Sequence, residues 1–230
     1  MQPLRHSIAL AALAFCAGAQ AQISDDVVKI GILTDMAGPY SGMGGAGSVV
    51  AARMAIDDCL KAECKGLKIE VVSADHQNKA DIAASKAREW IDTQGLTMIF
   101  SGTNSGTALA LAKIAEEKKR VLINNGAASS ALTNDQCTPY TVHYAYDTVA
   151  LSKGAAGAIV EGGAKTWFFL TADYAFGHAM EADASKVVKD KGGTVVNAVR
   201  HPLNASDFSS FLLQAQNSKA QVLALANAGG

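Results

Sequence analysis

The amino-acid sequence predicts an α/β fold of two successive lobes, each built from a mainly parallel sheet flanked by helices. Short runs rich in β-branched residues alternate with segments of helical periodicity, which is the pattern of parallel sheets. The alternation is interrupted near residues 142–148 and then begins again. With 49% hydrophobic residues and a formal net charge of -1, the composition is that of a folded globular chain.

The first unit contains four predicted strands with helices between them. The strands are expected at residues 27–33, 67–72, 97–100 and 121–123. In the first helix, apolar residues recur at spacings of three and four, which places Val49, Ala52, Ile56 and Leu60 on one face. Two further helices are expected over residues 79–91 and 105–117, and residues 124–133 form a loop of small residues.

The second unit begins after an extended stretch at residues 140–146, where Asp147 and Thr148 can cap a helix. Its strands are expected at residues 166–171, 194–199 and 221–226. Its two later helices carry apolar stripes, and the second is capped near Ser206 or Asp207. The stripes consist of Met180, Ala184, Val187 and Val188 in one helix and Phe208, Phe211, Leu212 and Ala215 in the other.

These patterns divide the chain into an N-terminal lobe at residues 22–145 and a second lobe at residues 146–230. The last predicted strand runs into a glycine turn without a closing helix. A sheet left in this way has an uncovered apolar face. We therefore expect the second lobe to be incomplete here and the chain to be part of a longer protein.

The first 21 residues have the features of a secretory signal peptide. A basic start at Arg5 precedes an apolar run at residues 8–17, and small residues lead to a cleavage site after Ala21. The run is shorter than the ~20 residues that a membrane-spanning helix needs. A bulky residue precedes Cys16, which disfavours a lipid anchor there. The sequence therefore predicts export to the periplasm.

The charge distribution argues against some classes of partner. Nucleic acids and anionic membrane surfaces require a concentrated basic face, whereas this chain is nearly neutral and has no long charge run. We therefore expect no nucleic-acid or membrane-surface binding. Small molecules and other proteins remain as partners.

Three cysteines remain after the predicted cleavage, namely Cys59, Cys64 and Cys137. In an oxidising compartment, Cys59 and Cys64 can form a disulfide at the end of the first helix. The alternative is three free or buried thiols. The spacing and the scattered histidines do not suit a zinc site, so we expect no metal.

Gly42, Gly44 and Gly47 match the G-x-G-x-x-G pattern of dinucleotide-binding loops. In such proteins the glycines begin directly at the strand end, whereas residues 34–41 intervene here. An NAD(P)-binding oxidoreductase built on these glycines is therefore kept only as an alternative. No G-x-S-x-G nucleophile motif occurs, so we expect neither a cofactor nor catalytic residues.

Two segments of small and hydroxyl residues directly follow strands of the first unit, at residues 102–106 and 126–130. Backbone N–H groups at such a sheet edge can bind an anion, and the first segment opens a helix. The alternative is ordinary capping by Ser105 and Ser129. Three carboxylates also follow predicted strands, as ligand groups, caps or hinge contacts: Asp35, Asp75 and Asp173.

Five segments together resemble the leucine/isoleucine/valine-binding protein family, which are periplasmic substrate-binding proteins of ABC transporters with the type I periplasmic binding fold. The segments occur in the family's order across most of the chain after the signal peptide. They are residues 29–40 (KIGILTDMAGPY), 71–79 (VVSADHQNK), 104–110 (NSGTALA), 171–177 (TADYAFG) and 207–211 (DFSSF).

This resemblance implies a two-lobed protein, without enzymatic activity, that closes on a small ligand and delivers it to a membrane permease. The ligand would be a carboxylate, either a branched-chain or other amino acid or an aromatic acid. The residues that would hold it are Asn104 or Ser105, then Ala127, Ala128 and Ser129, with Tyr174 or Phe176 from the second lobe. A monomer is expected. The ligand-binding domain of a sensory receptor with the same fold is the remaining alternative.

The segment after the fourth strand departs from the family's pattern. It reads Asn124-Asn125-Gly126, and Ser129 stands where threonine is common. The contact with a ligand's α-amino group is therefore an open question at this point.

Overall fold

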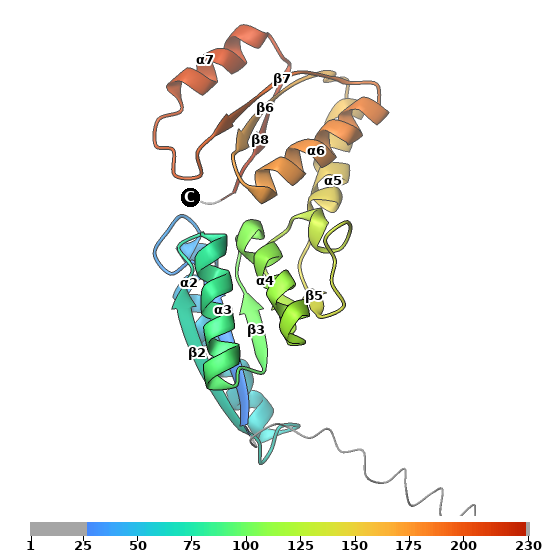
Figure 1. The fold of residues 1–230 in the computed structure, drawn as a ribbon. Helices are drawn as coiled ribbons and strands as arrows, with labels where there is room; N and C mark the ends of the chain where they lie inside the picture. The colour runs from blue at the N-terminus through green and yellow to red at the C-terminus, as the bar shows by residue number, and fades with distance from the viewer. Residues whose placement is uncertain (1–26, 229–230) are drawn as a thin grey trace, which may run out of the picture.

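The computed structural model describes residues 27–228, so the predicted signal peptide and its cleavage after Ala21 lie outside the described residues. Parallel strands and helices alternate along the whole of this range, in two units (Figure 1). In the first unit the elements are β1 (Val27–Thr34), α2 (Ser41–Lys61), β2 (Lys68–Asp75), α3 (Ala80–Gln94), β3 (Met98–Ser101), α4 (Ser105–Lys118), β4 (Val121–Asn124), the short 3-10 helix η3 (Ser130–Leu132) and β5 (Thr141–His143). In the second unit they are α5 (Thr148–Glu161), β6 (Thr166–Ala172), α6 (Ala175–Asp190), β7 (Thr194–His201), α7 (Ser209–Ser218) and β8 (Val222–Ala226).

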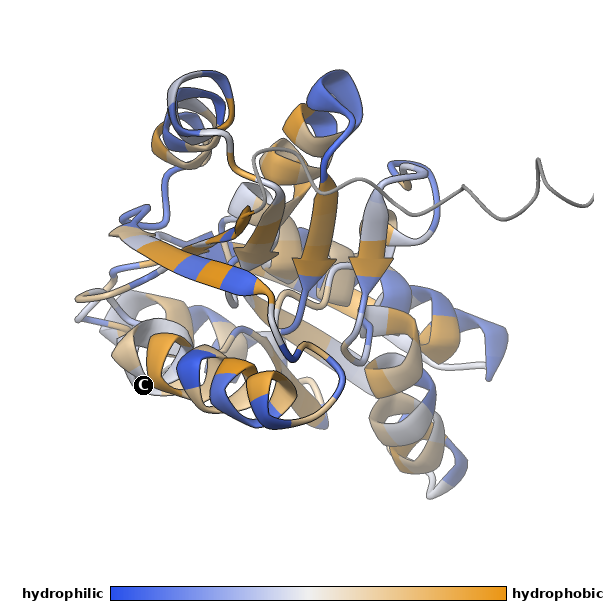
Figure 2. Ribbon diagram, turned by 90° about the horizontal axis from the view of Figure 1, so that it is seen from below, coloured by the Kyte–Doolittle hydropathy of each residue, from blue (hydrophilic) through white to orange (hydrophobic). Residues whose placement is uncertain are grey.

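The first sheet has the order β2-β1-β3-β4-β5, and all its pairings are parallel. Its central strands β3 and β4 are short and mainly apolar, and alternate residues along each of them are buried. Helices α3 and α4 supply Trp90, Leu111 and Ile114 to one face, where they pack with Leu33, Ile99 and Leu122 of the strands. Hydrophobic residues concentrate on the strands, while the helices also carry hydrophilic residues (Figure 2).

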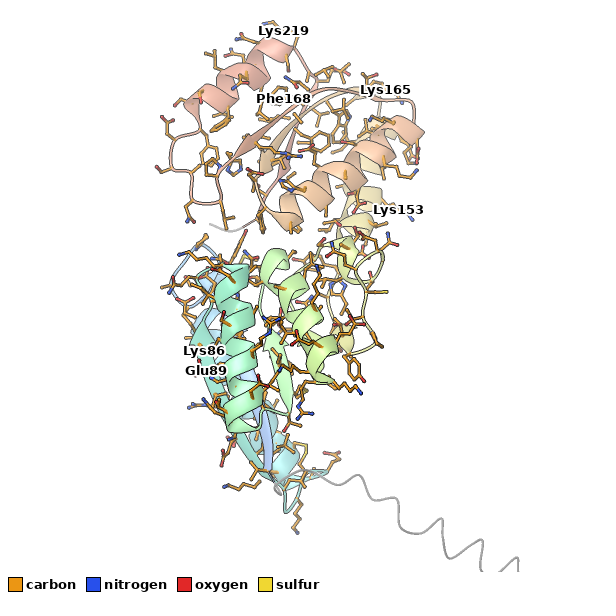
Figure 3. The ribbon with its side chains drawn as sticks, in the orientation of Figure 1. Lys86, Glu89, Lys153, Lys165, Phe168 and Lys219 are labelled. Carbon is orange, nitrogen blue, oxygen red and sulfur yellow. A yellow bond between two sulfur atoms is a disulfide. The ribbon has the colours of Figure 1, made fainter. Side chains whose placement is uncertain are left out.

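The second sheet has the order β7-β6-β8 and is also parallel. The central strand β6 is buried along nearly its whole length. Trp167 and Phe169 pack with Val160 of α5 and Val188 of α6 on one face. Because side chains alternate along a strand, Phe168 points to the other face, which α7 approaches (Figure 3).

The carboxyl ends of both sets of strands face each other across the junction between the two lobes (Figure 1). In the first lobe these ends are Thr34, Ser101 and Asn124, and in the second they include Ala172 and Ala226. The predicted lobe boundary between residues 145 and 146 falls in the connection between β5 and α5. The parallel two-sheet α/β fold was predicted from the sequence, and the structure confirms it.

Three details of the helices differ from the prediction. The first helix begins at Ser41, so the glycine-rich stretch lies inside its first turns, with non-helical backbone at Gly45. In α7, Leu212 was expected on a packed face but is 47% exposed, although α7 packs against β6 and β7.

The N-cap of α7 is Phe208, whose side chain makes no capping hydrogen bond, and the predicted cap at Ser206 or Asp207 lies one or two residues too early. The Asp207 carboxylate nevertheless accepts a hydrogen bond of 2.8 Å from the backbone N–H of Ser209, the first residue of the helix.

The structure joins Cys59 and Cys64 by a disulfide at the C-terminal end of α2, with their Cα atoms 5.0 Å apart. Cys137 is a free and exposed cysteine. We expect non-reducing peptide mapping of the exported protein to find the peptide with Cys59 and Cys64 lighter by two hydrogen atoms than after reduction. Alkylation of both cysteines without a reductant would contradict this pairing.

Candidate functional site

The first turn of α4 brings Asn104 and Ser105 to the carboxyl edge of the first sheet. Asn104 is the N-cap: its Oδ1 accepts a hydrogen bond of 3.0 Å from the Thr107 backbone N–H. Both residues are buried. A helix N-terminus concentrates partial positive charge, so this turn is suited to a negatively charged group. The structure assigns the capping that sequence attributed to Ser105 to its neighbour Asn104.

The small-residue segment 127–129 lies beside this turn and is held in a defined conformation. Asn124, at the end of β4, accepts a hydrogen bond from the Ala127 N–H at 3.1 Å and donates one to the Ala127 carbonyl at 2.6 Å. His143 Nε2 lies 2.8 Å from the same carbonyl oxygen. The Ser129 N–H donates to Ser105 Oγ at 3.2 Å, which ties the two predicted segments together.

Ser129 itself is buried, at 1% exposure, and lies at the start of η3. Its hydroxyl accepts only a long hydrogen bond of 3.4 Å from the Ala131 N–H. The capping hydrogen bond of this buried hydroxyl is therefore weak. The side chain retains the capacity for a stronger hydrogen bond.

The second lobe contributes Tyr174 and Phe176 at the start of α6. Their rings lie 6.0 Å apart, and Phe176 is buried while Tyr174 is half-buried. The Tyr40 hydroxyl of the first lobe donates a hydrogen bond of 2.5 Å to the Tyr174 hydroxyl. Burial raises the pKa of both tyrosines, so the two hydroxyls remain protonated and neutral near pH 7.

A network of polar side chains centred on Asp35 holds the loop between β1 and α2, which contains Tyr40. The buried Asp35 carboxylate accepts hydrogen bonds from the Gly38 and Tyr40 backbone N–H groups at 2.7 and 2.8 Å. It also accepts one of 2.7 Å from Asn78 Nδ2, and Asn78 Oδ1 accepts from Asn104 Nδ2 at 3.2 Å. Burial opposes ionisation of Asp35, but these hydrogen bonds outweigh it and hold its pKa below the ordinary value.

The structure thus places all seven predicted ligand residues at the junction of the lobes, on α4, on the segment after β4 and at the start of α6. Sequence reasoning did not select Tyr40, Asn78 or Asn124. Tyr40 and Asn78 lie inside the motifs at residues 29–40 and 71–79, in the loops that follow β1 and β2, and this is the signal that could have found them.

A cavity of about 530 Å³ lies elsewhere, between α2 and the first sheet. Its walls are mainly apolar and include Ile30, Ile69 and Phe100. Among the predicted ligand residues, none lines it. A carboxylate would find few hydrogen-bond donors there, so this cavity is not the candidate site.

The glycine-rich stretch does not form a phosphate-binding loop. It lies within α2, and Gly44 and Gly45 are buried against the strand ends. A side chain at Gly45 would place Cβ 2.9 Å from the Asp35 carbonyl oxygen, so close packing explains this glycine. The structure therefore gives no support to the NAD(P)-dependent alternative.

Within residues 27–228, none of the helices combines the length and the apolarity that crossing a membrane requires. In the same range, no three or more His, Cys, Asp or Glu side chains are grouped so that they could hold a metal ion.

Comparison with known proteins places these features in a family. The family described as periplasmic binding protein matches residues 27–230. A periplasmic binding protein of known structure from Burkholderia mallei is 63% identical, with a TM-score of 0.86, over 89% of this chain and 54% of that chain.

Two further relatives carry more specific names. A solute binding protein of an ABC transporter from R. palustris, solved in complex with 4-hydroxybenzoate, is 26% identical, with a TM-score of 0.73, over 86% of this chain and 53% of that chain. Leu/Ile/Val-binding protein homolog 6 of Brucella abortus (strain 2308) is 28% identical over 93% of this chain and 54% of its own length. The chain spans about half the length of these relatives. With its fold, its motifs and a family match that covers all the described residues, the chain belongs to the periplasmic binding protein family.

Proposed function

We propose that this protein is an extracytoplasmic solute-binding protein that captures a small carboxylate between its lobes and delivers it to an ABC-type permease. The observation that supports this most directly is the convergence of three segments at the junction of the lobes. These are the first turn of α4, the segment 127–129 and the start of α6. Each contains residues that the sequence predicts as ligand contacts.

The chemistry of these segments suits an anion held between two helix ends. A Cβ at Gly106 would lie 4.0 Å from the Ala175 Cβ, so the N-termini of α4 and α6 approach each other closely. Both ends contribute partial positive charge. Ser105 and Ser129 add hydroxyl groups, and Tyr174 and Phe176 add an aromatic wall from the opposite lobe.

Such a ligand would contact both lobes, which is the condition for ligand-driven closure. A ligand shifts an open–closed equilibrium only if it binds the closed state more tightly. Closure would occur as a hinge motion about the segment that connects the lobes, near residues 144–147. Binding and release by this motion need no chemical step, so we propose a transport component and not an enzyme.

The ligand class follows from the carboxylate-binding segments and from the relatives. One relative bears the name of leucine, isoleucine and valine, and another was solved with 4-hydroxybenzoate. Amino acids and aromatic acids share a carboxylate, for which the two helix N-termini are suited. We propose one of these two classes as ligand, in a periplasmic, monomeric protein whose signal peptide is removed after Ala21.

A thermal-shift screen of the full-length protein tests this proposal, with branched-chain amino acids, benzoate and 4-hydroxybenzoate as probes. A ligand that binds only the folded state raises apparent stability by RT ln(1 + [L]/Kd). We expect a shift with at least one of these acids and none with its amide or alcohol analogue. Shifts only with uncharged compounds would contradict the proposed site.

The same acid would then be titrated by calorimetry into a Ser129→Ala variant. Loss of a hydrogen bond to a charged group weakens binding by roughly 1.5–3 kcal/mol, or about ten- to a hundredfold. Ser210→Ala, on the exposed face of α7, is the matched control. Equal affinity of both variants would limit Ser129 to its weak capping role.

A further inference from the structure

One carboxylate of the second lobe binds two hydroxyl groups at the junction of the lobes. Asp183 lies in the middle of α6. Its Oδ2 accepts hydrogen bonds from Ser130 Oγ at 2.9 Å and from Thr148 Oγ1 at 2.6 Å. Ser130 follows the first-lobe ligand segment directly, and Thr148 is the first residue of α5. Asp183 therefore connects the ligand segment with two helices of the second lobe.

Backbone hydrogen bonds close the same cluster. The Ser130 N–H donates to Thr148 Oγ1 at 3.1 Å, and the Thr148 N–H donates to the Ala128 carbonyl at 2.9 Å. The Thr148 hydroxyl thus accepts from Ser130 and donates to Asp183, which fixes its orientation. The backbone of residues 128–130 is therefore attached to α5, and through Asp183 to α6.

The setting of this cluster makes it stronger than an ordinary surface contact. Thr148 has no exposed surface, and Asp183 and Ser130 are half-buried. Hydrogen bonds to an ionised carboxylate are roughly twice as strong as those between neutral groups. By contrast, the ion pair of Lys186 and Asp190 on the same helix is exposed, and such pairs contribute little.

The position of the cluster relates it to closure. The chain passes from the first lobe to the second at residues 144–147, immediately before Thr148. Groups beside such a connection lie near the axis of a hinge rotation, whereas the Tyr40–Tyr174 contact joins the lobes through loops on either side of the junction. Interactions near the axis can persist through a limited rotation of the lobes. Further rotation would stretch the hydrogen bonds of Asp183 with Ser130 and Thr148, so these bonds limit the opening and hold the ligand segment beside the hinge.

We infer that Asp183 is a positioning residue that, through Ser130 and Thr148, clamps the ligand segment 127–129 to the hinge and limits the range of lobe opening. The inference rests on the proposed function for its effect on ligand affinity. Its effect on opening requires no ligand. Asp183 acts through Ser130 and Thr148, and the ligand contacts assigned above do not include it.

The range of opening can be measured as a distance distribution between two spin labels. Glu89 on α3 and Lys219 after α7 are exposed and lie in different lobes (Figure 3). The labels would be attached to Glu89→Cys and Lys219→Cys in the full-length protein, with Cys137 and any other free cysteine replaced by serine. Double electron–electron resonance then reports the ligand-free ensemble.

We expect Asp183→Ala to broaden this distribution and to raise the Kd for leucine or 4-hydroxybenzoate about tenfold. Asp183→Asn retains an acceptor oxygen and should restore the narrow distribution and most of the affinity. Asp190→Ala is the control on the same helix and should change neither. A merely structural role would lower the melting temperature without altering the distribution in the folded protein.

If Asp183→Ala does not fold, Ser130→Ala removes one donor and leaves the Thr148 contact in place, so it should also broaden the distribution. An unchanged distribution in a folded Asp183→Ala or Ser130→Ala variant would overturn the inference. If neither acid binds the parent protein while the distribution still broadens, then the proposed ligand class fails and the clamp stands.

Discussion

Replacing Gly177 with alanine is expected to destabilise the protein by about 3 kcal/mol, at the upper end of what overpacking costs. A Cβ at this position would lie 2.0 Å from the Ala172 carbonyl oxygen and 3.1 Å from the Ala226 carbonyl oxygen. Both neighbours are backbone atoms at the ends of β6 and β8, so neither can move without displacing a strand. The gain in helix propensity from glycine to alanine, about 1 kcal/mol, is smaller than this cost.

Because Gly177 has no side chain, the start of α6 can lie directly on the edge of the second sheet. This close approach sets the position of Tyr174 and Phe176 at the junction of the lobes. We therefore expect Gly177→Ala to weaken ligand binding as well as stability. Urea denaturation and calorimetry of the same preparation would measure the two effects.

Gly154→Ala is a matched control, and it is expected to stabilise the protein where Gly177→Ala destabilises it. Gly154 is exposed in the middle of α5, and a Cβ there meets no atom within 4 Å. The substitution should stabilise the protein by roughly 0.5–1 kcal/mol, because alanine is the better helix former. Equal denaturation midpoints for Gly177→Ala and the parent would show that α6 does not approach the sheet edge as described.

The order of elements could be predicted from the sequence because each strand is a short apolar run and each helix has an apolar stripe. Ala184 and Val188, predicted on one face of a helix, are buried together in the core of the second lobe. The start of the first helix could not be predicted, because glycine is a poor helix former and the run from Gly42 to Gly47 obscures the periodicity. Its stripe, with Val49 and Ile56, is only partly buried because the cavity separates α2 from the sheet.

The sequence predicts which segments form the candidate site, but it does not predict the contacts between their side chains. Residues after parallel strands meet at one edge, which is why the segments at residues 102–106 and 126–130 come together. The network of Asp35, Asn78 and Asn104 requires the register of β1 with β2, in which Thr34 pairs with Asp75. Register and lobe orientation depend on packing between residues far apart in sequence, and no local pattern records them.

Replacing Asp35 with asparagine is expected to cost about 3 kcal/mol of stability at pH 7, because three donors then share an uncharged acceptor in a buried position. The cost should depend on pH. The pKa of Asp35 in the folded protein lies below the ordinary value of about 3.9, so the unfolded state takes up the proton first as the pH falls. Its stabilising contribution is therefore fully present above about pH 4 and is lost as the pH falls through the folded-state pKa.

His76 makes a second pH-dependent contribution to the free energy of unfolding, which must be separated from that of Asp35. It is fully buried, its Nε2 has no hydrogen-bond partner in the described residues, and burial lowers its pKa. The stability that neutral His76 contributes is present above the ordinary histidine pKa of about 6.5 and is lost as the pH falls below it. Like Asp35, His76 therefore destabilises the folded state in acid, but it does so at a higher pH.

The Asp35 charge raises the pKa of His76 and so offsets part of the effect of burial, and the His76 contribution therefore differs between the parent and Asp35→Asn. Both proteins are compared in a His76→Gln background, which removes this second titration. Unfolding free energies measured in urea between pH 3 and 7 should therefore differ by a constant amount down to about pH 5, and the difference should shrink below about pH 4. A difference that stays constant to pH 3 would mean that Asp35 titrates alike in both states. In that case the hydrogen bonds to the Tyr40 loop would not be what stabilises its charge.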